Sequence, residues 1–235
     1  MDPATPWREE RDAFDAWLHA ALGPARVTAI FLTHHHVDHV GDAARLRDKL
    51  GVPVWAHPET AERVDVKVDR LVHDGELLAI DDGMDLRAIH TPGHAQGHLC
   101  LFDERTRMVV AGDMVAGVGS ILIDPPEGHM GTYLASLERL IALAPRGLIP
   151  SHGYWMADGQ GRLREQLAHR ARRQAAVKGA LPTTPASARE LVPVVYGADT
   201  PAAMWHFAER SMLAALELCV ERGEAVRSGD RFARA

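Results

Sequence analysis

Short apolar segments that run directly into histidine or aspartate constrain the fold of this chain more than any other feature of its sequence. Residues 27–32 form such a segment, and His34-x-His36-x-Asp38-His39 follows it at once. Strand-like segments, turn residues and helical segments then alternate up to about residue 150. This alternation is typical of a layered α/β domain, so we expect the histidine segment to form a tight loop at the carboxyl edge of a sheet.

Three further histidine and aspartate residues end later strand-like segments. His94 follows Thr-Pro-Gly, Asp113 follows Ala-Gly, and His152 lies between Ser and Gly. Glycine lets the backbone come close to a bound ion, and imidazole and carboxylate are ligands that suit Zn²⁺. The first two histidines of the loop motif can turn one way and its Asp-His pair the other. The sequence therefore predicts a site for two adjacent metal ions.

The remaining segments up to residue 157 complete this α/β domain. Apolar residues at helical spacing predict helices, and short apolar runs predict buried strands. Asp82-Gly83 predicts the turn of a hairpin within residues 75–91. We expect helices over residues 8–22, 41–50 and 133–144, and strands over residues 52–55, 99–102, 108–111 and 147–150.

The character of the sequence changes near residue 158. A long helix is expected over residues 162–179, and its basic residues are Arg162, Arg164, Arg170, Arg172, Arg173 and Lys178. We interpret this basic face as solvated, with contact to nucleic acid as the alternative. Helices over residues 186–195 and 201–222 and a hairpin over residues 225–233 follow. This order favours a winged helix, so we divide the chain into residues 1–157 and 158–235.

Bulk composition excludes several classes of protein. The formal net charge of −6 argues against coating nucleic acid or membrane by bulk electrostatics. Two cysteines, Cys100 and Cys219, are too few for a disulfide framework or a thiolate cluster. No apolar run approaches the roughly 20 residues that span a bilayer, and the first residues do not resemble a secretory signal. We expect a cytoplasmic protein with no membrane partner.

The complete motif set resembles the signature of the metallo-β-lactamase superfamily in its hydrolase form, over about residues 27–155. The resemblance implies an αββα sandwich and two zinc ions per chain. By this resemblance His34, His36 and His94 hold the first ion. The resemblance likewise implies that Asp38, His39 and His152 hold the second ion and that Asp113 bridges the two.

Further segments resemble one branch, the lactamase-beta-like protein two group, which joins this hydrolase domain to a C-terminal winged helix and includes single-strand endoribonucleases. The matching segments are Ala111-Gly112-Asp113, residues 123–128 and Tyr133-Leu134-x-Ser136-Leu137. Relatives carry several strands before the histidine motif, whereas some thirty residues precede it here. We therefore expect the N-terminal strands of the sandwich to be missing and its first sheet to expose an edge, which favours pairing into a homo-oligomer.

The implied site is suited to hydrolysis. Two Zn²⁺ ions, two aspartates and a bridging hydroxide leave a charge of about +1, which stabilises the anion formed when hydroxide attacks. The ions also lower the pKa of the shared water to about 7, and Asp38 is expected to orient the resulting nucleophile. The residues leave two substrates open: a single-stranded RNA phosphodiester and a small carbonyl compound such as a thioester or lactone.

Two functions of other classes compete with this hypothesis. A nucleic-acid-binding regulator would use the winged helix and keep the metal domain as a scaffold, but the complete ligand set argues against it. A mononuclear iron oxygenase would need one ion, whereas retention of Asp38, His39 and His152 favours two.

Residues near the motifs have more than one interpretation. His98 either contacts a substrate or a metal ligand or packs at a strand start, and His35 is expected to point away from the metals. Tyr154 and Trp155 either line the substrate cleft or belong to the core.

Overall fold

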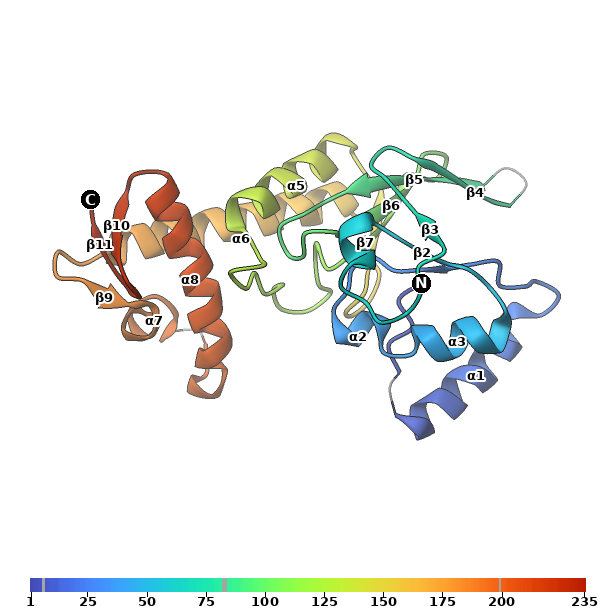
Figure 1. The fold of residues 1–235 in the computed structure, drawn as a ribbon. Coiled ribbons are helices and arrows are strands. Elements are labelled where there is room, and N and C mark those ends of the chain that lie inside the picture. Colours follow the sequence, from blue (N-terminus) through green and yellow to red (C-terminus); the bar gives the residue numbers. More distant parts are fainter. Residues whose placement is uncertain (6, 82–83, 199) are drawn as a thin grey trace.

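The computed structural model describes residues 1–5, 7–81, 84–198 and 200–235. Two β-sheets pack against each other in the N-terminal part of the chain, and helices cover their outer faces (Figure 1). The predicted α/β class is therefore confirmed. The elements of this part are α1 (Arg8–Leu22), β1 (Ile30–Phe31), α2 (Val37–Val40), α3 (Ala43–Leu50), β2 (Val54–Ala56), α4 (Pro58–Ala61), β3 (Arg70–Leu71), β4 (Leu77–Asp81), β5 (Met84–His90), β6 (Leu99–Asp103), β7 (Met108–Gly112), α5 (Met130–Ala142) and β8 (Gly147–Pro150).

The first sheet contains three parallel strands in the order β1-β2-β3. Side chains alternate across a strand, so Ile30 and Leu32 pack with Leu46 of α3, whereas Phe31 lies in the core between the two sheets. The paired strand is shorter than the predicted residues 27–32. Within the described residues β1 forms one edge of this sheet, as expected, and the backbone N–H of Asp2 donates to the Phe31 carbonyl at 3.0 Å.

The second sheet has the order β4-β5-β6-β7-β8. Its first four strands are antiparallel neighbours, and β8 then lies parallel to β7. It follows that β5, β7 and β8 run in the same direction, so their carboxyl ends lie at one edge. The outer face is covered by α5, whose Tyr133, Leu137 and Leu140 are completely buried. The predicted turn at Asp82-Gly83 lies outside the described residues.

The C-terminal part is a small helical domain with a three-stranded sheet, β10-β11-β9. Its elements are α6 (Gly159–Ala180), β9 (Ala186–Ser187), α7 (Ala188–Tyr196), η1 (Ala202–Met204), α8 (Trp205–Glu221), β10 (Ala225–Ser228) and β11 (Arg231–Arg234). The prediction of helix from residue 186 is wrong by two residues. Ser187 adopts an extended conformation because it caps α7 in a capping box with Glu190, and this extended segment pairs with β11.

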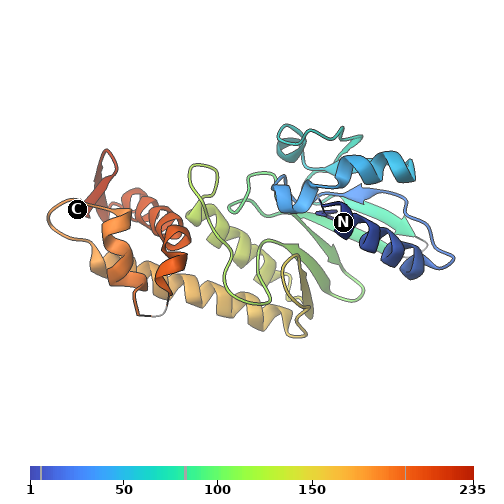
Figure 2. The same ribbon diagram turned by 90° about the horizontal axis from the view of Figure 1, so that it is seen from below.

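Helix α6 belongs to both hydrophobic cores. Leu163 in its first half packs in the core of the second sheet, and Val177 in its second half packs in the core of the winged helix. Figure 2 shows this helix running from one part of the molecule to the other. The domain boundary predicted after residue 157 falls just before it. Among the helices of the described residues, none combines the length and apolarity needed to cross a membrane.

A histidine pair outside the predicted ligand set joins the two sheets. His57 caps α4 by accepting the backbone N–H of Glu59 at 3.3 Å. Its ring stacks on that of His90 at the end of β5, with ring centroids 4.2 Å apart and planes 11° from parallel. Burial and the neighbouring His90 lower the pKa of His57 from 6.5 to about 4.

This lowered pKa predicts an acid-labile fold. The folded chain keeps His57 neutral at a pH where the unfolded chain protonates it, so this contribution to stability is complete above pH 6.5 and lost as pH falls towards 4. We expect His57→Asn, which keeps a capping oxygen, to reduce the loss between pH 7 and pH 5 by about 1–2 kcal/mol. Urea unfolding at both pH values measures it. Equal losses in the variant and the wild type would contradict the assignment.

Candidate metal centre

Four strand ends bring the seven predicted ligands into one cluster. The loop after β1 carries two of the histidines, and the short helix α2 that follows carries the Asp-His pair. The other three residues follow β5, β7 and β8, the strands that run in the same direction. The residues brought together are His34, His36, Asp38, His39, His94, Asp113 and His152. The sheet topology therefore explains why residues so far apart in sequence meet.

Glycine makes the close approach of these loops possible. Gly93 has a φ of +126°, and a Cβ atom there would lie 2.3 Å from the backbone nitrogen of Tyr133 in α5. Gly112 has a φ of +51°, and its Cβ would lie 2.4 Å from Nε2 of His98. Larger residues would push His94 and Asp113 away from the cluster.

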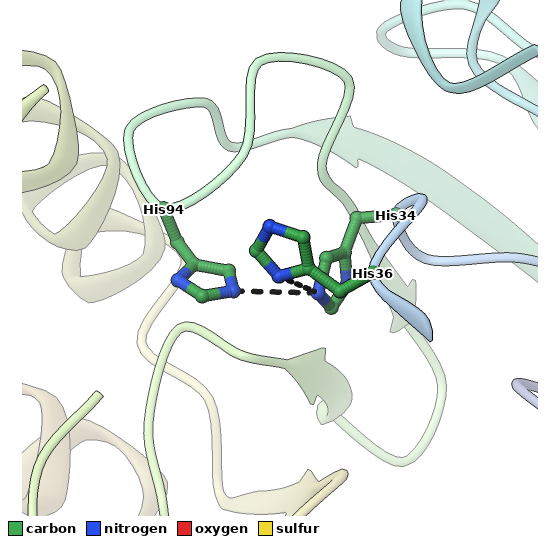
Figure 3. A group of neighbouring side chains, drawn as sticks. All are labelled: His34, His36 and His94. Carbon is green, nitrogen blue, oxygen red and sulfur yellow. Dashed lines mark hydrogen bonds between the residues drawn. The ribbon is translucent and has the colours of Figure 1, made fainter. Parts of the chain in front are cut away.

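The first group consists of three imidazoles whose ring nitrogens face one another (Figure 3). Nε2 of His34 lies 3.0 Å from Nδ1 of His36 and 3.3 Å from Nε2 of His94. A tetrahedral Zn²⁺ ion with Zn–N bonds of about 2.0–2.1 Å would hold its nitrogen ligands about 3.3 Å apart. The spacing of these nitrogens therefore fits one zinc ion.

The second group lies beside the first and is more open. Oδ2 of Asp38 lies 3.8 Å from Nε2 of His39 and 3.4 Å from Nε2 of His152. The Asp38 side chain is 58% exposed and that of His152 is 47% exposed, whereas His39 is buried. Asp113 lies between the groups, with one carboxylate oxygen 3.5 Å from His39 and the other 3.5 Å from both His94 and His152.

The electrostatics of the cluster also fit metal ions. Nε2 of His39 and Oδ1 of Asp113 are buried and have no hydrogen-bond partner among the described residues. Burial and neighbouring histidines lower the pKa of His34, and burial lowers that of His94, so both present neutral rings. Burial also lowers the pKa of His39, but the carboxylates of Asp113 and Asp2 outweigh it and raise that pKa to about 10. A cation at this position would take the place of that proton.

Hydrogen bonds on the far side of three rings select the tautomer that exposes Nε2. Nδ1 of His94 donates to the carbonyl of Leu122 at 2.8 Å. Nδ1 of His34 donates to Oγ1 of Thr33 at 3.0 Å, because that hydroxyl gives its own proton to a carboxylate. Such outer partners fix the orientation of imidazole ligands and increase their basicity.

The third partner is Asp2. The sequence analysis did not predict that this residue belongs to the site. Its carboxylate accepts from Nδ1 of His39 at 3.0 Å and from both the backbone N–H and the hydroxyl of Thr33 at 2.7 Å. It also lies 3.4 Å from Oγ of Ser151, next to His152. Asp2 thus holds the histidine loop.

His98 supports the site from beneath. It is completely buried, and its Nε2 accepts the backbone N–H of Asp113 at 3.0 Å, while Nδ1 donates to Thr91 at 2.8 Å. The sequence left open whether His98 contacts a substrate or a metal ligand or packs at a strand start. In the structure it contacts the backbone of Asp113, a predicted metal ligand.

The other residues singled out from the sequence lie outside the cluster. His35 pairs with Glu127 at 3.1 Å, as expected for a ring that points away from the two metal groups. Tyr154 and Trp155 are 64% and 63% exposed, so neither belongs to the core. Burial raises the pKa of the Cys100 thiol to about 12 and that of Cys219 to about 11, which leaves neither as a ready nucleophile.

A cavity of about 660 Å³ opens over the metal groups. Residues of the 116–127 segment line it, together with five of the predicted ligands: His36, Asp38, His94, Asp113 and His152. Arg210 of α8 reaches its rim and binds Asp124 and the carbonyl of Pro125. The second domain therefore contributes to the cavity in which a substrate would lie.

The role of Asp2 predicts a loss of metal affinity on substitution. Asp2→Ala removes the acceptor that orients His39, so we expect the second metal position to bind about 10–100-fold more weakly, with the first position less affected. Competition with a chelating dye measures both affinities. Asp12→Ala, at an exposed carboxylate of α1, is the control, and unchanged affinities in Asp2→Ala would contradict the assignment.

Comparison with known proteins identifies both parts of the chain. The model described as the metallo-beta-lactamase superfamily matches residues 2–152, and that of the beta-lactamase associated winged helix domain matches residues 187–234. An atrochrysone carboxyl ACP thioesterase from Cryptosporiopsis sp. (strain 8999) is 32% identical over 162 residues, which make up 68% of this chain and 47% of that protein. The chain spans about half the length of the curated relatives it matches.

One solved structure matches the chain over its whole length, and another matches about two thirds of it. A metallo-beta-lactamase family protein from Thermus thermophilus has 29% sequence identity and a TM-score of 0.83, over 100% of this chain and 89% of that one. Another protein, solved in a di-iron-bound form, has 28% identity and a TM-score of 0.57, over 68% of this chain and 83% of that one. The first family model covers more than half of the chain. The chain therefore belongs to the metallo-β-lactamase superfamily and carries the winged helix domain associated with it.

Proposed function

We propose that this protein is a hydrolase of acyl thioesters that works with two zinc ions per chain. The observation that carries the proposal is the convergence of seven histidine and aspartate side chains. Among them Nε2 of His39 and Oδ1 of Asp113 lie 3.5 Å apart and are buried without a hydrogen-bond partner among the described residues. Buried polar atoms are normally satisfied, and a bound cation would satisfy both. The seven residues would hold the two ions in the groups described above.

The bound ions would supply a hydroxide at neutral pH and a positive charge beside the carbonyl oxygen. The chain itself positions the reactants. Asp38 lies on the open side of the cluster, where its carboxylate can orient the attacking water and accept its proton. In the overall reaction a C–O bond forms, the C–S bond breaks and the leaving sulfur takes a proton, which gives an acid and a thiol.

Three observations favour a thioester over RNA. A relative with 32% identity is named as an ACP thioesterase. The net charge of the chain is −6. Basic residues on the surface of the winged helix pair with carboxylates, as in Arg227 with Glu217 at 3.1 Å and Arg231 with Glu190 at 3.0 Å. Such pairs leave less positive charge for phosphate contacts, which provide most of the affinity for nucleic acid.

The donor set supports zinc as the metal. Imidazole nitrogens and carboxylate oxygens at a spacing close to that of tetrahedral ligands suit this ion. Iron is the competing metal, because one structural relative was solved in a di-iron-bound form. Retention of ligands for a second ion argues against an oxygenase with a single iron.

Release of thiol from the acyl thioester of N-acetylcysteamine tests the proposed function. We expect the zinc-loaded chain to hydrolyse this compound and Asp38→Ala to lower kcat about 10²–10⁴-fold, because the variant loses the group that handles the proton of water. Asp48→Ala, at a 78% exposed carboxylate of α3, should retain the activity. Cleavage of single-stranded RNA without thioester hydrolysis would contradict the proposal.

A further inference from the structure

A second cavity, of about 640 Å³, lies between the two domains and next to the metal centre. We call it the interdomain cavity. Residues of the 115–122 segment, Met156 and residues of α6 between 162 and 173 line it, together with Tyr196, Thr200, Met204, Phe207, Ala208 and Ser211. Four residues, Ala116, Ser120, Ile121 and Leu122, line this cavity and also the cavity over the metal groups. The two cavities therefore adjoin along one short segment of chain.

The shared segment joins the interdomain cavity to the metal centre through its backbone. The carbonyl of Ile121 accepts from the guanidinium of Arg170, and the next carbonyl, that of Leu122, accepts from Nδ1 of His94. A group bound beside Arg170 would thus lie close to a chain segment that orients a predicted metal ligand.

The interdomain cavity is rich in positive charge. Arg162, Arg170, Arg172 and Arg173 all line it, together with one carboxylate, Glu165, which is paired with Arg162. The basic face predicted on this helix is therefore not simply solvated, and for Arg170 that prediction is wrong, because this residue is only 6% exposed. Helical spacing turns Arg170 and Arg173 towards the same side of α6, where the cavity lies.

Arg170 is a buried charge that lacks a full set of partners. Its guanidinium lies 5.2 Å from the centre of the Tyr133 ring, and its Nε is buried without a hydrogen-bond partner among the described residues. Taking a charge out of water costs free energy unless it is paired. An anion in the interdomain cavity would lower this cost.

The lining also contains polar residues, such as Ser120, Gln166 and Ser211, and several apolar ones. Val115, Ile121 and Ala208 are buried at its walls, while Met204 and Phe207 of the second domain are 46% and 45% exposed. A ligand that fits such a cavity has an apolar or amide chain and an anionic group at one end. A thioester substrate that carries a phosphate on its thiol side has this chemistry.

We propose that the interdomain cavity binds the phosphate-bearing pantetheine arm of an acyl thioester, with the phosphate beside Arg170 and Arg173 and the thioester carbonyl at the metal centre. This inference rests on the proposed thioesterase function and adds the class of leaving group. The arm is common to acyl coenzyme A and acyl carrier proteins, so this chemistry is shared by two sources of substrate.

Binding of a thioether that cannot be hydrolysed tests the inference without any use of activity. S-ethyl phosphopantetheine carries the arm and its phosphate, and isothermal titration calorimetry gives its Kd for the full chain. We expect Arg170→Gln and Arg173→Gln to weaken binding about tenfold each, since each removes a charged contact with the phosphate. Arg164→Gln, at an exposed residue of α6 that does not line the cavity, should leave the Kd within about twofold.

Phosphate-free S-ethyl pantetheine should bind more weakly than the phosphorylated probe and should bind equally to all four proteins. Arg173 is only partly buried, so its variant is informative even if Arg170→Gln does not fold. An unchanged Kd for phosphopantetheine in folded Arg173→Gln would overturn the inference. The inference would also be overturned if the variants lost affinity for S-ethyl coenzyme A but not for S-ethyl phosphopantetheine, because the arginines would then contact the nucleotide phosphates.

Hydrolysis of the phosphate-free N-acetylcysteamine thioester separates the two proposals. If the wild type and Arg173→Gln hydrolyse it equally while their Kd values for phosphopantetheine are also equal, the thioesterase function stands and the inference about the cavity falls. If phosphopantetheine binds with the expected dependence on arginine but no thioester is hydrolysed, the proposed function falls and the binding site remains.

Discussion

The close packing of the seven predicted metal ligands at one edge of two sheets is the constraint on which the rest of the structure depends. Imidazoles with facing nitrogens and a buried carboxylate oxygen without a hydrogen-bond partner among the described residues destabilise a fold unless a cation joins them. The sandwich can hold this arrangement because the four strand ends that carry the residues are fixed by the packing of sheet on sheet and helix on sheet. The packing of the fold thus holds together a cluster of side chains that would otherwise separate.

The hydrogen bonds behind the cluster show how separate parts of the chain depend on one another. Asp2 binds the backbone and hydroxyl of Thr33 together with the ring of His39, so the first residues of the chain hold the histidine loop. On the opposite side the 121–122 backbone binds both His94 and Arg170. Helix α6 therefore connects the winged helix to the metal centre through Arg170 as well as through its place in both cores.

Sequence reasoning predicted those features that follow from local pattern. Apolar runs that end in histidine or aspartate beside glycine located the strand ends, and parallel strand directions then brought these residues together. The extended segment of β9 escaped prediction because Ala186 and Ser187 are too short a run to show a period of two, and the cap on α7 decides their conformation. Spacing along the chain also gave no sign that Asp2 contacts His39, because this contact joins residues 37 positions apart through the tertiary fold.

The burial of Arg170 could not be read from the sequence for a related reason. Helical spacing shows which residues share a face of α6, but it does not show which neighbour covers that face. Arg170 lies at the level where the helix passes from one core to the other, so its environment is set by the 115–122 segment and by the second domain. Arg164, on the same helix, is exposed.

The metal content of the purified, monodisperse chain tests the central claim most directly. Mass spectrometry after reconstitution with zinc should find close to two ions per chain, because the two groups of ligands are complete and share Asp113. A content well below one ion per chain, after reconstitution with zinc and separately with iron, would show that these side chains do not form a metal centre and would contradict the account.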